Sequence, residues 1–241
     1  MLKNKRILVV GGSGSIGGAV VEGLPERGAR VFASARTEAG AERLISRYSG
    51  VSDVTVLRIH VLQPSSQWGL DWTAFIQNNL DGIVYAVGDC PPRGFDNAIK
   101  HPLNALSGED IKYDLELHCV GFQNLMREAL PVLGPSASVV AVSSAITRLT
   151  DKDCPSWLYA GHYAAATAAK DELVRWWRRD PKIQKKGVKI HRIAFGAVDT
   201  PFHEGSIHKP PALIPLKMAA GEIIAALESD VIVDKTVMAL Q

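Results

Sequence analysis

Tyr163 and Lys170 are the residues whose types and spacing most clearly suggest proton chemistry, and they lie in the alanine-rich stretch HYAAATAAK. A phenol has an ordinary pKa of about 10, so it exchanges protons poorly at neutral pH unless a nearby cation favours the phenolate. In a helix, seven steps of 100° return to within about 20° of the first direction, so Lys170 shares the face of Tyr163. The lysine then lies about 10.5 Å further along the axis, a distance that its long, N-terminally leaning side chain partly recovers.

A second chemical pattern is the glycine-rich turn GGSGSIG at residues 11–17. It lies between an expected strand and an expected helix, where glycines let backbone N–H groups approach a pyrophosphate and let the helix pack close to the sheet. The spacing Gly12-x-Gly14-x-x-Gly17 matches the dinucleotide-binding pattern in that context, although a merely flexible turn is the alternative. The predicted cofactor-binding residues of this turn are Gly11, Ser13, Ser15, Ile16 and Gly17.

The end of the second expected strand indicates which dinucleotide binds. An NAD site would place a carboxylate there for the ribose 2′-hydroxyl, but the run VFASAR at residues 31–36 contains no acid before Glu38. Arg36 can instead pair with a 2′-phosphate, helped by Ser13 or Ser34. The sequence therefore favours NADP(H), with an ordinary surface arginine as the alternative reading of Arg36.

The elements that position these residues alternate along the chain. Expected strands cover residues 6–10, 31–34, 54–59, 82–86, 138–143 and 189–195, and expected helices cover 16–27, 39–48, 72–78, 108–130 and 158–179. Strands that are apolar on both faces and alternate with helices require a parallel sheet covered on both sides. We predict one α/β domain over residues 1–241, a doubly wound Rossmann-type parallel sheet with helices on both faces.

Composition restricts the class of protein. The chain has 241 residues, 46% of them hydrophobic, with a net charge of +2, which argues against nucleic acid or an anionic membrane as a partner. No apolar run approaches the roughly 20 residues needed to cross a bilayer. Cys90, Cys119 and Cys154 show no Cys-x-x-Cys spacing, so we expect a reducing, cytoplasmic location and no metal site.

The order of the glycine turn, Arg36, Ser144, Tyr163 and the segment FGAVDT at residues 195–200 resembles the short-chain dehydrogenase/reductase family over essentially the whole chain. The resemblance implies that Ser144 holds the substrate oxygen and that Tyr163 transfers the proton. It also implies that Val198 and Thr200 hold the nicotinamide carboxamide. Residues 200–215, rich in proline, would form a loop that binds a small-molecule substrate.

Several positions depart from the family pattern. Tyr85-Ala86-Val87-Gly88 stands where Asn-Asn-Ala-Gly is usual, so Ala86, Val87 and Gly88 are the expected cofactor contacts there. His60 replaces an adenine-contacting aspartate, which leaves Val61 and the backbone for that contact. His118 replaces an asparagine of the proton relay; histidine carries protons at neutral pH, although ordinary packing is an equal alternative. The stretch between Ser144 and Tyr163 is longer than usual and is expected to form a flap.

The family lysine raises the main open question. In most members it follows the tyrosine by four residues, and Thr167 occupies that place here. Tyr-x-x-x-x-x-x-Lys resembles the enoyl-acyl carrier protein reductase branch, which would make Lys170 the relocated lysine. The apolar positions Ala169, Leu173 and Trp177 instead fit the ordinary family helix with Thr167 in the lysine place. Relocation and loss both remain open.

Two functions follow from the sequence. The first is an NADP(H)-dependent oxidoreductase that transfers hydride to or from a carbonyl or conjugated enone, with Ser144 and Tyr163 acting on the substrate and Lys170 or His118 supporting the phenol. The alternative is a catalytically drifted relative, an NADP(H)-binding sensor, scaffold or non-redox enzyme. The resemblance also implies a homodimer or homotetramer formed through the two long helices, with Trp176 and Trp177 available for the contact.

Overall fold

The computed structural model describes residues 2–68, 79–88, 107–149, 161–201, 210 and 212–239. The expected helix at residues 72–78 lies outside them, as do Cys90 and the expected flap residues Asp151, Asp153, Cys154, Pro155 and Trp157. Residues 202–209 and 211 of the expected substrate loop also lie outside.

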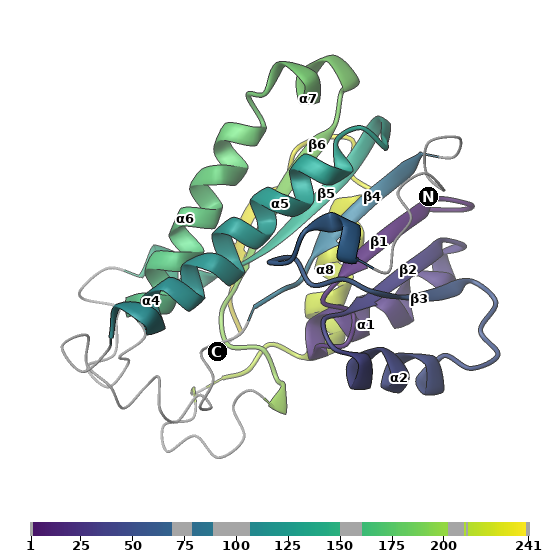
Figure 1. The fold of residues 1–241 in the computed structure, drawn as a ribbon, viewed down its shortest axis with the longest axis horizontal. Coiled ribbons are helices and arrows are strands. Elements are labelled where there is room, and N and C mark those ends of the chain that lie inside the picture. The colour runs from purple at the N-terminus through teal and green to yellow at the C-terminus, as the bar shows by residue number, and fades with distance from the viewer. Residues whose placement is uncertain are drawn as a thin grey trace.

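A seven-stranded parallel sheet forms the centre of the described chain (Figure 1). Its strands are β1 Arg6–Val10, β2 Arg30–Ala35, β3 Val54–Arg58, β4 Leu80–Tyr85, β5 Leu133–Ser144, β6 Lys189–Phe195 and β7 Asp234–Val237. Their spatial order is β3-β2-β1-β4-β5-β6-β7, so the order reverses between β1 and β4. Ligands of open α/β sheets bind outside the carboxyl ends of the strands at such a reversal.

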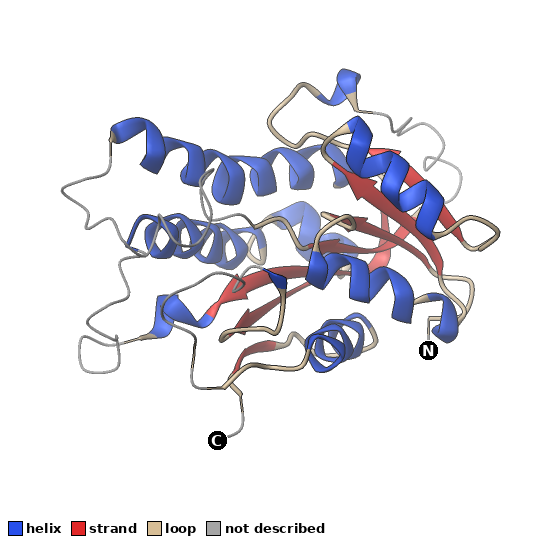
Figure 2. Cartoon of the chain, turned by 90° about the horizontal axis from the view of Figure 1, so that it is seen from below, coloured by secondary structure: helices blue, strands red, loops and turns tan. Residues whose placement is uncertain are grey.

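Helices cover both faces of this sheet, which Figure 2 shows as red strands between blue helices. They are α1 Ser15–Gly23, α2 Glu38–Arg47, α4 Gly108–Leu115, α5 Gly121–Ala129, α6 Gly161–Trp177, α7 Pro181–Lys186 and α8 Leu216–Leu227. Alternation along β1 explains the two cores: Val9 packs with α1 and α8, whereas Leu8 packs with α5. The predicted doubly wound α/β fold is confirmed.

The structure differs from the sequence expectation at several places, among them α7, which was not predicted. The first helix ends at Gly23, because Pro25 cannot continue it and instead begins a short 3₁₀ turn, Pro25–Arg27. After residue 215 the chain adds α8 and β7, neither of which was predicted. β7 is a four-residue edge strand, so it carries little hydrophobic alternation that a sequence pattern could reveal.

The long helix expected over residues 108–130 is present but contains a π turn, Glu116–Val120, between α4 and α5. The Gly121 N–H donates to the carbonyl oxygen of Glu116, because the Leu117 carbonyl oxygen instead accepts a 2.7 Å hydrogen bond from the Tyr85 hydroxyl. A Cβ added at Gly121 would lie 2.7 Å from that hydroxyl oxygen. Tyr85 and Gly121 together therefore place the π turn, which carries His118.

Candidate active site

The glycine turn after β1 is shaped by backbone contacts that only glycine permits. Gly11 has φ +88°, and a Cβ there would lie 2.7 Å from the Ala86 carbonyl oxygen. A Cβ added at Gly17 would lie 2.2 Å from the Gly11 carbonyl oxygen. Gly14 caps α1 without a side-chain hydrogen bond, so the first helical N–H groups, beginning at Ser15, are left for a ligand. This turn fits a pyrophosphate.

The carboxyl end of β4 joins this turn to the π turn. The Ala86 N–H donates to the Val10 carbonyl oxygen at 2.9 Å, which holds the residues after β4 beside the end of β1. Two residues on, a Cβ added at Gly88 would lie 3.4 Å from Cε1 of His118. Val87 packs against the hydrophobic cluster beneath. Ala86, Val87 and Gly88 therefore line the path from the phosphate turn to His118.

His118 and Tyr163 meet across two helices. Their ring centroids lie 5.1 Å apart with an interplanar angle of 84°, an edge-to-face contact between the π turn and α6. The imidazole is buried and the phenol is half-buried. The sequence predicts that both residues take part in proton transfer, and in the structure their rings are in contact.

Ser144 is the last residue of β5 and is half-buried. Its Oγ accepts a 3.3 Å hydrogen bond from the Ile146 N–H, which leaves the hydroxyl proton available to donate. Thr147 fixes the turn: its hydroxyl donates to the Ser144 carbonyl oxygen at 3.0 Å and lies 3.4 Å from Oδ2 of Asp171 on α6. The end of β5 is thus tied to the helix that carries Tyr163.

Lys170 lies beneath the site rather than at its surface. Its side chain is 1% exposed, and its Nζ donates to the Val142 carbonyl oxygen at 2.6 Å and lies 5.9 Å from the centroid of the Tyr85 ring. Burial lowers the pKa of the ammonium to about 8, a shift that nearby Asp171 opposes. The role of Lys170 stays a prediction.

Thr167, in the place of the family lysine, is fully buried on the same side of α6 as Lys170. Its hydroxyl meets no hydrogen-bond partner among the residues that the structure describes. A buried hydroxyl without a hydrogen-bond partner lowers the stability of the fold. Packing alone therefore does not explain why a threonine, rather than an apolar residue, stands at position 167.

The adenosine end of the expected nucleotide site is marked by Arg36, which follows β2. Its Nη1 donates to the Tyr113 hydroxyl of α4 at 3.1 Å, and its charge adds to burial in lowering the pKa of His60. Val61 is buried, and its carbonyl oxygen accepts from the Asn124 side chain at 2.9 Å. Ser34 Oγ accepts from the Gly11 N–H at 3.4 Å, and Ser13 is exposed at the glycine turn.

The segment after β6 contains the residues expected at the nicotinamide end of the nucleotide site. Val198 is buried and Thr200 is half-buried. The Asp199 N–H donates to the Ile214 carbonyl oxygen at 2.9 Å, and the Ile214 N–H donates to the Ala197 carbonyl oxygen at 2.8 Å. These bonds hold together the two ends of the expected substrate loop, residues 200–215.

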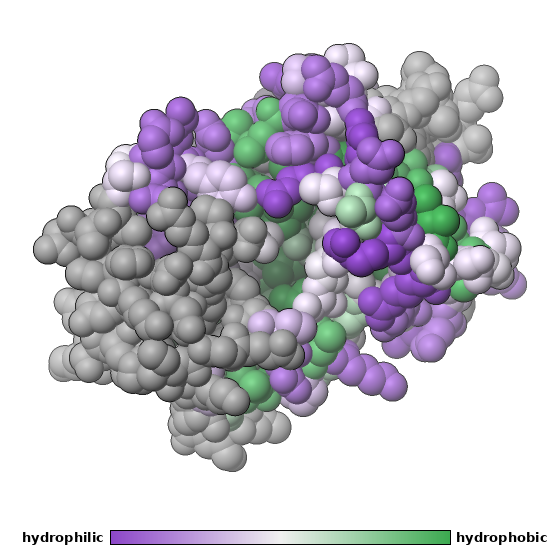
Figure 3. All heavy atoms as spheres, turned by 60° about the horizontal axis from the view of Figure 1, so that its bottom comes forward, coloured by the Kyte–Doolittle hydropathy of each residue, from purple (hydrophilic) through white to green (hydrophobic). Residues whose placement is uncertain are grey.

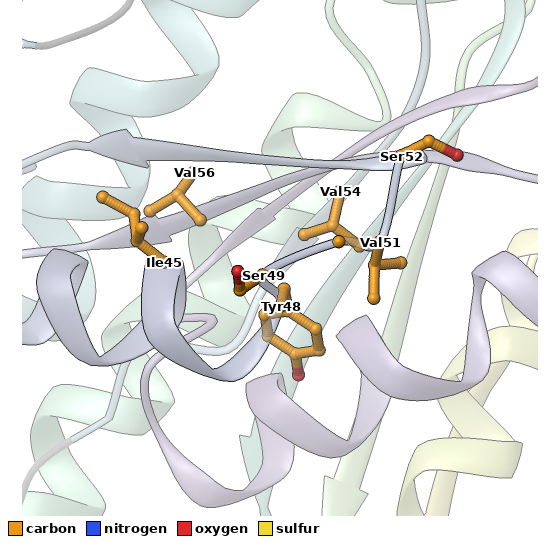
Figure 4. A pocket seen from close by; sticks show the side chains of 8 residues that line it. Ile45, Tyr48, Ser49, Val51, Ser52, Val54 and Val56 are labelled. Carbon is orange, nitrogen blue, oxygen red and sulfur yellow. The ribbon is translucent and has the colours of Figure 1, made fainter.

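A separate groove of about 570 Å³ lies at the edge of the sheet, between the end of α2 and β3 (Figure 4). Ile45, Tyr48 and Val56 are among its lining residues, and it includes none of the residues predicted for the site. Figure 3, which brings the lower side of Figure 1 forward, shows hydrophobic residues in a central hollow with hydrophilic residues beside them. Within the described parts of the chain, no group of three or more metal-ligating side chains gathers, and no helix has the length and apolarity to span a membrane.

Comparison with known proteins identifies the fold's relatives. A family model described as short chain dehydrogenase matches residues 5–210. This chain belongs to that family. The match supports the resemblance inferred from the glycine turn, Ser144 and Tyr163.

Individual relatives of this short-chain dehydrogenase are distant. A 3-amino-tetrahydro-pyrrolizinone reductase of Xenorhabdus hominickii is 26% identical over 204 residues, covering 83% of this chain but only 64% of that protein. An L-fucose dehydrogenase of Mus musculus is 26% identical over 208 residues, with 83% and 67% covered. A Burkholderia cenocepacia short chain dehydrogenase solved in complex with NADP has a TM-score of 0.71 and 20% identity, covering 100% of this chain and 90% of its own.

Sequence reasoning missed three contacts around the site. Tyr85 was noted only as a replaced asparagine, and Tyr113 was not considered. The pairing of Asp114 with His162 was also missed, although Asp114 stands four residues before His118 and shares its side of a helix. The four-residue spacing between Asp114 and His118 could have indicated that Asp114 lies near the site. Nothing in the sequence identified His162 as its partner.

Proposed function

We propose that this short-chain dehydrogenase is an NADP(H)-dependent oxidoreductase that interconverts a carbonyl, or a conjugated enone, with its reduced form. NADP(H) bound at the glycine turn would supply or accept the hydride. In the reducing direction Tyr163 gives a proton to the substrate oxygen while Ser144 donates a hydrogen bond to that oxygen. One hydride and one proton thereby convert a ketone to an alcohol.

One observation carries this proposal: a series of neighbouring residues leads from the glycine turn to the Tyr163 phenol. A Cβ added at Gly11 would meet the Ala86 carbonyl oxygen, a Cβ added at Gly88 would lie 3.4 Å from Cε1 of His118, and the His118 ring packs edge-to-face on the ring of Tyr163. A nucleotide seated on the turn would therefore extend toward the proposed proton donor. On this proposal Arg36 would lie near the 2′-phosphate of NADP(H), and Val198 and Thr200 would lie near the nicotinamide.

His118 is the better placed of the two groups proposed to support the phenol. It touches the Tyr163 ring, whereas Lys170 bonds to the backbone of β5 under the site. An imidazole beside the phenol can return a proton to it at neutral pH. Lys170 would act from beneath, as a buried amine whose pKa of about 8 lies near physiological pH.

The catalytically drifted alternative is favoured by a specific observation. Thr167 removes the family cation from the face beside Tyr163, and the nearest lysine along α6 is fully buried. Such a protein would bind NADP(H) without turnover. It would act as a sensor, a scaffold or a non-redox enzyme.

The test separates binding from turnover. Nucleotide binding is measured by fluorescence titration with NADPH and NADH, and turnover by loss of NADPH absorbance with a panel of aldehydes, ketones and enones. We expect Tyr163→Phe to lower kcat at least about 100-fold while the Kd for NADPH stays within about twofold. Binding without any turnover in the wild type would favour the drifted alternative. Absence of binding would overturn both functions.

We also propose a cytoplasmic homodimer or homotetramer. Trp177 packs into the core and its indole N–H donates to Gln123, whereas Trp176 is 54% exposed and has the guanidinium groups of Arg175 and Arg179 within 5.4 Å of its ring centroid. Trp176 is therefore the tryptophan available to a subunit contact. Light scattering of wild type and Trp176→Ala tests this, because a contact through Trp176 predicts a lower mass for the variant.

A further inference from the structure

A buried pair of ionisable side chains links α4 to α6 next to the proposed site. Oδ2 of Asp114 lies 3.5 Å from Nε2 of His162, and the two side chains are 0% and 1% exposed. Burying a carboxylate away from water costs several kcal/mol unless partners compensate, and burial also lowers the pKa of the His162 imidazole, so a buried pair of this kind calls for a specific explanation. The mechanism proposed above uses neither residue.

The position of the pair suggests its purpose. Asp114 and His118 stand four residues apart on the helix that contains the π turn, and His162 and Tyr163 are consecutive on α6. The Asp114–His162 contact and the His118–Tyr163 contact therefore join the same two helices at adjacent levels. A change in the spacing of the helices at the first contact would be transmitted directly to the second.

The π turn explains why the Asp114–His162 contact, which we call the brace, would be useful. A π turn is a rare and local departure from α-helical hydrogen bonding, and His118 lies inside it. On the side of the sheet, the turn is held by the hydrogen bond from Tyr85 to the Leu117 carbonyl oxygen. On the side of α6, the buried pair lies immediately before it, since Asp114 precedes Glu116 by two residues.

We propose that Asp114 and His162 are positioning residues that hold the π turn against α6 and so keep the His118 ring in contact with Tyr163. This role rests on the proposed function of Tyr163 as the proton donor. The pair itself touches neither substrate nor cofactor in this account. It acts through the geometry of two other side chains, for which a misplacement of about 1 Å is enough to cost up to 100-fold in rate.

The first readout is independent of activity. In the full-length protein labelled with ¹³C-histidine, the Cε1–H signal of His118 is identified by its loss in His118→Gln and by its shift in Tyr163→Phe. We expect Asp114→Asn and His162→Gln each to shift this signal. The double variant, in which an amide pair replaces the ionisable pair, should return the signal toward its wild-type position. Glu172→Gln, which alters an exposed ion pair on α6, should leave it unchanged.

The second readout is the division between kcat and binding. We expect each single variant to lower kcat about 10-fold while the Kd for NADPH and the KM for the carbonyl substrate change less than about twofold. If Asp114→Asn does not fold, His162→Gln and His162→Asn provide the same comparison. A wild type that binds NADPH but turns over no substrate would overturn the proposed function, and the His118 signal would still test the brace.

Two results would overturn the inference. The first is a folded single variant whose His118 signal and kcat both match the wild type. The second is a variant in which all histidine signals shift and the melting temperature falls without any effect specific to His118, because that pattern describes a pair that stabilises the fold in general. Recovery in the double variant is the outcome that a purely structural pair does not predict.

Discussion

Two parts of the expected site differ in how much substitution they tolerate: the nucleotide half, at the β1–α1 turn, and the catalytic half, where α4, the π turn and α6 meet. At the β1–α1 turn, Gly11 and Gly17 are held by backbone atoms that leave no room for a Cβ. His118 and Thr167, which the sequence resemblance aligns with an asparagine and a lysine, are both buried side chains. Steric limits on a backbone permit almost no substitution, whereas the supply of a proton permits several chemical solutions.

The largest expected effect is in the nucleotide half. Gly17→Ala places a Cβ 2.2 Å from the Gly11 carbonyl oxygen, so the turn must open. We expect unfolding free energy to fall by about 3 kcal/mol and NADPH affinity to fall about 100-fold. Denaturant unfolding and fluorescence titration measure the two effects.

The matched control for that substitution is Gly221→Ala in α8. No heavy atom lies within 4 Å of a Cβ added at Gly221, so the helix should gain up to about 1 kcal/mol. If Gly17→Ala behaved like this control, the contrast between a rigid nucleotide half and an adaptable catalytic half would be lost.

The next effect concerns Lys170 and depends on pH. Its pKa is about 8 in the folded protein and 10.5 when exposed, so between these values the unfolded chain binds more protons and stability rises with pH. Below pH 8 the buried ammonium costs about 3 kcal/mol. Lys170→Met should therefore be more stable than the wild type at pH 7 and should lack the rise between about pH 8 and 10.5.

Denaturant unfolding at pH 7, 8.5 and 10 measures this difference, with Lys185→Met as an exposed control of equal charge change. A Lys170→Met variant that is less stable at pH 7 would contradict the prediction. Turnover of the same variant sharpens the comparison: retained activity means that the family lysine was lost, and abolished activity in a stable protein means that it moved.

A smaller effect is expected at Arg36. Arg36→Ala should raise the Kd for NADPH about 10-fold, because a charge-assisted contact to the 2′-phosphate is removed, and should leave the Kd for NADH within about twofold. Arg58 is an exposed arginine at the end of β3. It pairs in the sheet register with Ala35, the residue before Arg36. Arg58→Ala serves as the control. Equal losses for both nucleotides would count against a 2′-phosphate site.

The smallest effect is at Thr167. Thr167→Val keeps the shape of the side chain and removes a buried hydroxyl that has no partner in the described structure, so unfolding free energy should rise by about 1 kcal/mol. The midpoint of urea unfolding measures it. Thr55→Val, on an exposed position of β3, should change stability by less than about 0.5 kcal/mol. Destabilisation by Thr167→Val would indicate that the hydroxyl has a role.

Hydrophobic periodicity and turn chemistry were enough to predict the sheet and most of its helices. Strands such as Ile7–Val10 are continuously apolar, and the glycine turn stands between β1 and α1 as its spacing requires. α8 was missed although most of its residues are apolar, because no helix or strand was assigned after the proline-rich stretch. Element type is local information, which a sequence carries directly.

The candidate site was only partly predictable, because its contacts are not local. Ser144, Tyr163 and Lys170 were predicted by type and spacing, and in the structure Lys170 is buried whereas Tyr163 is half-buried. Helical phase could not show that its Nζ would reach the backbone of β5. The π turn follows from a hydrogen bond between residues 32 apart, so no pattern within the helix reveals it.

The strand order has a consequence for how the chain folds. β1 pairs with β2 on one side and with β4 on the other, and its Val10 meets Tyr85 in the register. During synthesis at about 5–20 residues per second, roughly 4–15 seconds separate the appearance of these two residues. In that interval β1 presents an unpaired apolar edge, the kind of surface that chaperones protect. The reversal of strand order between β1 and β4 therefore leaves β1 without its second neighbour until β4 has been synthesised.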